Sequence, residues 1–141
     1  MLSLPIEVRE NIITDYYETG KSSIMQRYVE SVLLNNPDAI QRLFNDIFLY
    51  SVINDSHILA WNILVVLSQI SYEYLGSWAD MLAVSATRNK YLDVQEMGIR
   101  CFENWENHSS YAFLKRLKFT ESWLQEYADE VCAEEVEHRE N

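Results

Sequence analysis

Glycine and proline are scarce in this chain, with three glycines and two prolines among 141 residues. β-Sandwiches, barrels and nucleotide-binding folds use more glycine than this. With 48% hydrophobic residues, the chain still has enough apolar side chains to build a core. The composition therefore predicts an all-α protein, and the length fits a single domain over residues 1–141.

Cysteines and long hydrophobic runs are also rare. Cys101 and Cys132 are too few for a disulfide framework and do not form a CxxC motif, so we expect two free thiols. The strongest apolar run, residues 63–67, is far shorter than the roughly 20 residues of a membrane-spanning helix. Residues 1–7 lack the basic and apolar regions of a signal peptide. These absences predict a cytoplasmic protein that does not enter a membrane.

Positive charge is in short supply, because 11 Lys and Arg face 22 Asp and Glu and leave a net charge of −11. Such a field repels phosphate groups, so nucleic acids and anionic membranes are poor partners, whereas a basic protein is a good one. Residues 121–141 contain eight acidic residues and one arginine, which places −7 of this charge in the last segment. The segment is either a solvated helix face or a surface on which a basic partner docks.

Apolar residues recur every three or four positions along most of the chain, which predicts seven or eight helices stacked as antiparallel pairs. Asn36 and Ser56 are candidate N-caps, and Pro37 suits the first turn of the helix that follows Asn36. The expected helices cover residues 5–18, 23–35, 37–53, 56–70, 72–86 or 77–86, 92–105, 110–118, and 121–136 with a frayed tail.

Each expected helix has one apolar face, which we assign to the core. The clearest face belongs to residues 92–105, and we expect Ser109 or Ser110 to cap the helix that comes next. The residues assigned to the core include Val52, Met81, Ser85, Trp123 and, on the clearest face, Val94, Met97, Gly98, Cys101, Phe102 and Trp105.

Two segments of the chain, 55–64 and 93–102, align at a constant offset of 38 residues. The aligned pairs are Asp55 and Asp93, Leu59 and Met97, Ala60 and Gly98, Ile63 and Cys101, and Leu64 and Phe102. This pattern resembles that of HEAT-type helical repeats over residues 37–119, although their usual period is ~40–47 residues. The resemblance implies stacked helix pairs that bind other proteins along an extended face. An irregular helical bundle is the alternative.

No motif for catalysis or metal binding stands out. Gly20, Gly76 and Gly98 lie far apart, so they cannot form a phosphate-binding loop. None of the three histidines lies near a serine or cysteine in a nucleophile motif. Glu135 and His138 form one E-x-x-H segment, but a di-iron site needs two such segments and two further glutamates. We therefore expect a protein that is not an enzyme and has neither cofactor nor metal.

The remaining profile is that of a small, acidic, helical protein, and it is similar to that of bacterial immunity proteins. The resemblance implies a protein-binding module that neutralises a cationic partner, such as a toxin that cleaves nucleic acid. Such a toxin must be basic to hold its substrate. The alternative is an accessory or scaffold subunit of a larger assembly. The partner's identity and homo-oligomerisation stay open.

Candidate binding residues follow from the charge pattern. An acidic strip lies opposite the apolar face of residues 92–105, and rigid helices present such charges in fixed geometry. Trp61 lies on a helix that is apolar nearly all round, so it is a core residue or an exposed anchor. The candidate partner-binding residues are Asp93, Glu96, Glu103, Glu106, Asp55 and Trp61.

Overall fold

The computed structural model describes residue 31 and residues 35–140, of which the last six are described by their backbone alone. This part of the chain contains six α-helices, one 3₁₀ helix and no strand, which confirms the all-α class. The count is below the seven or eight helices expected for the whole chain, and the two expected at 5–18 and 23–35 lie outside the described residues apart from Ser31 and Asn35. The elements are α3 (Pro37–Ile53), α4 (His57–Gln69), η1 (Tyr72–Tyr74), α5 (Ser77–Thr87), α6 (Leu92–Trp105), α7 (His108–Arg116) and α8 (Ser122–Glu140).

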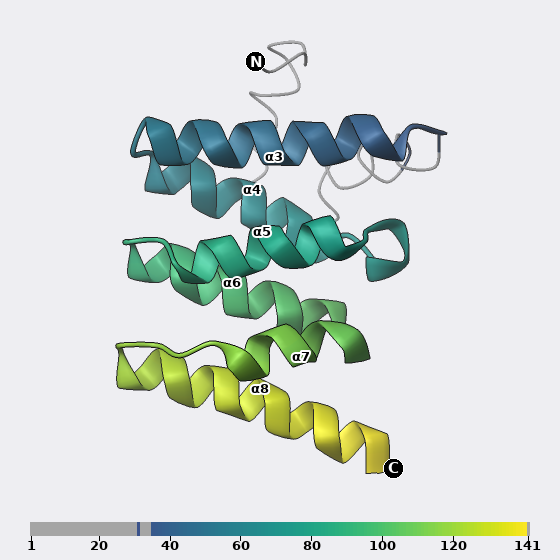
Figure 1. Ribbon diagram of the computed structural model, residues 1–141, viewed down its shortest axis with the longest axis vertical. Helices are drawn as coiled ribbons and strands as arrows, with labels where there is room; N and C mark the ends of the chain where they lie inside the picture. The colour runs from purple at the N-terminus through teal and green to yellow at the C-terminus, as the bar shows by residue number, and fades with distance from the viewer. Residues whose placement is uncertain (1–30, 32–34, 141) are drawn as a thin grey trace.

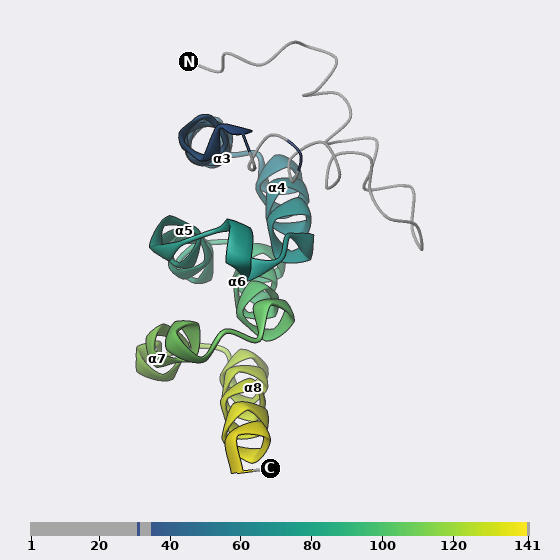
Figure 2. The ribbon, with the colours of Figure 1, turned by 90° about the vertical axis from the view of Figure 1, so that its right-hand side faces the viewer.

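The helices form three antiparallel pairs stacked along the long axis of the molecule, from α3 at the top of Figure 1 to α8 at the bottom. Turned by 90°, the stack shows two layers: α3, α5 and α7 lie in one, and α4, α6 and α8 lie in the other (Figure 2). Helix α6 is central, because it contacts α4, α5, α7 and α8. In the described part of the chain, no helix is both long and apolar enough to cross a membrane.

Local capping sets several helix ends as the sequence predicts. The side chain of Asn36 accepts a hydrogen bond from the Ala39 amide at 3.3 Å, and that of Ser56 accepts one from the Leu59 amide at 3.4 Å. These side chains satisfy amides that have no partner inside the first turn of α3 or α4. The turn between the two helices therefore falls where the sequence places it.

Two predicted helix ends are wrong. Helix α7 begins at His108 with Asn107 as its N-cap residue, so neither Ser109 nor Ser110 is the cap. The side-chain amide of Asn107 instead donates hydrogen bonds to the hydroxyls of both serines, at 2.8 and 2.9 Å. Helix α8 continues to Glu140, four residues beyond the predicted end at 136.

The apolar face of α6 is buried as predicted, from Val94 to Trp105. The two segments that align at an offset of 38 residues, α4 and α6, are in contact. The Trp105 indole N–H donates to the Leu67 carbonyl, 38 positions earlier, at 3.2 Å. A Cβ at Gly98 would lie 2.8 Å from the Ala83 carbonyl oxygen and 2.9 Å from the Thr87 methyl carbon. Glycine at this position therefore allows α5 and α6 to approach closely.

Four residues assigned to the core are exposed instead. Met81 and Ser85 face solvent because α5 buries Ala79, Ala83 and Ala86 against its neighbours, and alanines contribute only a weak hydrophobic pattern. Val52 is exposed beside the turn after α3. Trp123 is exposed because α8 ends the stack and packs through the face of Leu124, Ala128 and Val131. These predictions are wrong.

Candidate partner-binding surface

Helices α4 and α6 pack against each other, and a groove of about 300 Å³ is lined by residues of both. Its lining comes from the sides of the two helices that face each other in one layer of the stack. We call this hollow the α4–α6 groove. The lining residues are Trp61, Val65, Ser68 and Gln69 of α4, and Glu96, Met97, Arg100 and Asn104 of α6.

The α4–α6 groove combines an apolar floor with charge on one rim. Trp61 and Val65 are half-buried and pack against the core, while Met97 is buried below them. On the α6 side, an Arg100 guanidinium nitrogen lies 3.8 Å from a Glu96 carboxylate oxygen. At this distance the ion pair contributes little to stability, because both side chains are partly solvated. Little free energy would therefore be lost if the Glu96 and Arg100 side chains bound a partner protein instead of each other.

Glu103 links α6 to α8. Its carboxylate accepts a hydrogen bond of 2.7 Å from the Tyr127 hydroxyl, and the Arg100 guanidinium carbon lies 6.0 Å from the centre of the Tyr127 ring. Burial raises the pKa of Tyr127 well above its usual value, and the hydrogen bond to Glu103 raises it further. Glu103 therefore has a structural partner inside the chain as well as a place on the predicted acidic strip.

Acidic side chains are concentrated on the layer that contains α6 and α8. Glu126 and Glu130 are exposed on α8, and neither forms an ion pair with another described side chain. Asp129 is also exposed, and one of its oxygens accepts a hydrogen bond from Gln125 at 3.0 Å. The basic residues Lys115 and Arg116, in contrast, end α7 in the opposite layer. The two layers therefore carry charge of different sign at this end of the stack.

The structure brings some of the predicted binding residues together. Trp61 and Glu96 line one groove from two different helices, so Trp61 is half-buried core and a groove residue at once. Asp93 and Glu103 lie on the same helical face as Glu96, at spacings of three and seven residues. This part of the predicted site forms one continuous surface.

Two predicted residues lie elsewhere. Asp55 and Glu106 each follow a helix in a left-handed backbone conformation, with φ of 53° and 49°. Neither residue lines the α4–α6 groove. Both residues therefore stand in turns at helix ends and not on the exposed face of α6.

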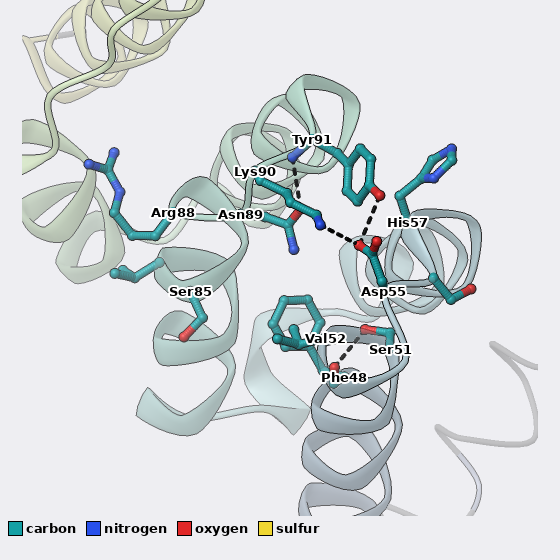
Figure 3. Close-up of a pocket in the computed structure, with 12 residues that line it drawn as sticks. Phe48, Ser51, Val52, Asp55, His57, Ser85, Arg88, Asn89, Lys90 and Tyr91 are labelled. Carbon is teal, nitrogen blue, oxygen red and sulfur yellow. Dashed lines mark hydrogen bonds and ion pairs between the residues drawn. The ribbon is translucent and has the colours of Figure 1, made fainter.

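Asp55 instead lines a second, larger hollow of about 670 Å³, which is shown in Figure 3. This loop pocket lies where the turn between α3 and α4 meets the turn between α5 and α6. Its lining residues are Phe48, Ser51, Val52, Asp55, Ser56, His57, Val84, Ser85, Arg88, Asn89, Lys90 and Tyr91.

Asp55 joins the two turns of the loop pocket. One carboxylate oxygen accepts hydrogen bonds from the Lys90 ammonium and the Tyr91 hydroxyl, each at 2.8 Å. These two hydrogen bonds hold the pKa of Asp55 below its usual value. The His57 ring packs against the Tyr91 ring with 4.6 Å between their centres. The sequence pattern did not predict this pocket, although the 38-residue offset is a signal that the two turns are equivalent and lie on the same side of the stack.

Comparison of the chain with protein families, with curated proteins and with solved structures finds no match. Among the described residues, no group of three or more His, Cys, Asp or Glu side chains is arranged to hold a metal ion. The side chains of the E-x-x-H segment, Glu135 and His138, lie outside this description. The surface chemistry of the groove and the pocket is therefore the basis for assigning a function.

Proposed function

We propose that this protein is a non-enzymatic helical-repeat module of HEAT type that binds a basic protein in the cytoplasm. The observation that carries the proposal is the position of Trp61 and Glu96 in one groove between neighbouring helices. Acidic residues extend from this groove along α6 and onto α8. Stacked helix pairs typically bind proteins along an extended surface of this kind.

The chemistry of the groove suits a partner that presents an apolar anchor beside lysine or arginine. Tryptophan is enriched among the residues that dominate binding energy, and a partner side chain would cover Trp61 and Val65. Carboxylates around it accelerate the approach of a basic protein and select against acidic ones. With a net charge of −11, the whole chain adds to this attraction.

The most specific form of the proposal is neutralisation of a toxin that cleaves nucleic acid. The active surface of such an enzyme is basic, because it must hold a phosphate backbone. An acidic helical surface competes for the same cations and blocks access to them. This mode of action requires no catalytic residue in the inhibitor.

A second candidate function is that of an accessory subunit, and one observation favours it. The outer side of α3 exposes Leu49 and Ile53, which are 57% and 72% accessible. Exposed apolar side chains that lie together mark candidate protein contacts. A subunit held through this side of α3 would depend on apolar contact and little on salt.

Association kinetics distinguish the two functions. The tagged full chain captures its partner from cells of its source, and stopped flow then measures the association rate over a salt series. The test variant Asp93→Lys/Glu96→Lys changes the acidic strip and leaves the Glu103–Tyr127 hydrogen bond in place. The control Asp38→Lys/Asp46→Lys makes the same change in charge on α3, in the other layer.

For an acidic binding surface, we expect the rate to fall steeply with salt and to fall several-fold more in the α6 variant than in the α3 control. Trp61→Ala should then raise the dissociation rate. A rate that is indifferent to salt and to both charge variants would overturn the proposal. If Leu49→Asp/Ile53→Asp abolished binding in that case, the accessory-subunit function would be supported.

A further inference from the structure

The charged residues that line the loop pocket are mostly basic, whereas those of the whole protein are mostly acidic. Arg88 and Lys90 line the pocket, and Asp55 is the one acidic residue among its lining side chains. The whole chain, in contrast, has twice as many acidic as basic residues. Because positively charged side chains line this pocket, it attracts a different class of molecule from the one that the acidic helices attract.

Lys90 and Asn89 supply hydrogen-bond donors at the polar side of the pocket. Lys90 has three N–H donors, of which one is directed at Asp55. The side-chain oxygen of Asn89 accepts from the Tyr91 amide at 3.0 Å, which orients its NH₂ group for two further donations. A ligand at this side must therefore supply acceptors.

Arg88 contributes a fixed positive charge to the same region. Its guanidinium donates to the Lys118 carbonyl at 2.8 Å and lies 5.2 Å from the centre of the Phe119 ring. These contacts hold the side chain between α5 and the turn before α8. In Figure 3 the guanidinium points away from Asp55. Arg88 acts at a distance through its charge and need not touch a ligand.

The opposite side of the pocket is apolar. Phe48 is buried, Val84 is half-buried and Val52 is 51% exposed, and all three line the hollow. They come from α3 and α5, neighbouring helices of one layer. A volume of about 670 Å³ lies within the usual ~300–1,000 Å³ of small-molecule sites.

We propose that the loop pocket binds a small organic anion made of a carboxylate and a short apolar chain. The apolar chain packs on Phe48, Val52 and Val84, and the carboxylate accepts hydrogen bonds from Lys90 and Asn89. None of these residues lines the α4–α6 groove, so this site is separate from the proposed protein-binding surface.

Three probes with the same eight-carbon chain test the proposal on the full chain: octanoate, octylammonium and octanol. Calorimetry gives the dissociation constant of each, and amide NMR shifts report where it binds. The overall charge of −11 favours octylammonium, whereas the loop pocket favours octanoate. We expect octanoate to bind most tightly, with the largest shifts at Asn89 and Lys90.

Two neighbouring residues supply a matched pair of variants. Val52 lines the pocket and Ile53 does not, and both are largely exposed at the end of α3. Val52→Glu places a carboxylate in the pocket and should weaken octanoate binding by about tenfold, whereas Ile53→Glu, whose carboxylate lies outside the pocket, should weaken it much less. Octanoate that binds no more tightly than octylammonium or octanol, or an equal effect of the two variants, would overturn the proposal.

Discussion

At the scale of single residues, Gly98 sets the distance between α5 and α6. The intrinsic helix propensity of alanine is better than that of glycine by about 1 kcal/mol, so Gly98→Ala would stabilise an isolated helix. In the folded chain the new Cβ would meet the Ala83 carbonyl oxygen at 2.8 Å. A backbone oxygen cannot move aside as a flexible side chain can, so the clash outweighs the gain in propensity.

We predict that Gly98→Ala lowers the free energy of unfolding by about 1–3 kcal/mol, as measured by urea denaturation. Gly76→Ala is the control, because a Cβ at Gly76 would lie 3.6 Å from the nearest Trp78 atom, an ordinary contact. This control should change stability little. Gly98→Ala stability equal to or above that of wild type would show that the two helices are not in close contact.

At the scale of elements, α6 holds the stack together because it packs against helices on both sides. Phe102 has no exposed surface and lies edge-on to Trp105, with 5.9 Å between the ring centres. Cys101 and Trp105 each reach a carbonyl of α4, at 3.6 and 3.2 Å. A cavity in this helix therefore affects more than one helix pair.

We predict that Phe102→Ala lowers the free energy of unfolding by about 3–5 kcal/mol, since it removes buried surface and leaves a cavity. Leu92→Ala on the same helix is the control, because Leu92 is 41% exposed. Urea denaturation of both variants gives the comparison. A loss below about 1 kcal/mol for Phe102→Ala would contradict a core position.

The sequence predicts α6 better than α5, and the reason lies in their side chains. The apolar face of α6 consists of large residues such as Met97 and Phe102, which give a clear helical period. Helix α5 buries alanines and Asp80, whose carboxylate accepts a hydrogen bond of 2.6 Å from Tyr72. A face of small and polar residues has no such period, so Met81 is assigned to the wrong side.

At the scale of the whole molecule, several ionisable groups make stability depend on alkaline pH. Burial raises the pKa of Cys101, Tyr72 and Tyr127, and hydrogen bonds to carboxylates add to the rise at both tyrosines. The folded chain therefore keeps these protons at a pH where the unfolded chain releases them. Stability is then fully present below about pH 9 and falls as pH rises beyond it.

We predict that the urea concentration at the midpoint of unfolding decreases when the pH is raised from about 8 to about 10.5. Tyr127→Phe removes one of the titrating groups and should make this fall smaller than in wild type. The comparison is made within each variant across pH, so a uniform loss from the missing Glu103 hydrogen bond does not affect it. An identical fall in both proteins would show that Tyr127 is not responsible.

The stack also decides which distant residues meet. Asp55 and Tyr91 are 36 positions apart, yet they share a hydrogen bond because equivalent turns of successive helix pairs lie together. Trp61 and Glu96 meet for the same reason on neighbouring helices. The sequence names most of these residues as candidates, but it does not separate the groove from the pocket.

The sequence by itself determines the all-α class, the ends of α3 and α6, and the caps at Asn36 and Ser56. These features depend on contacts within three or four residues, which the order of side chains specifies directly. Only the tertiary structure decides which face of α5 is buried and where the groove and the loop pocket form. Those features depend on the spacing between helices, which the close contact of Gly98 with Ala83 sets across 15 positions of the chain.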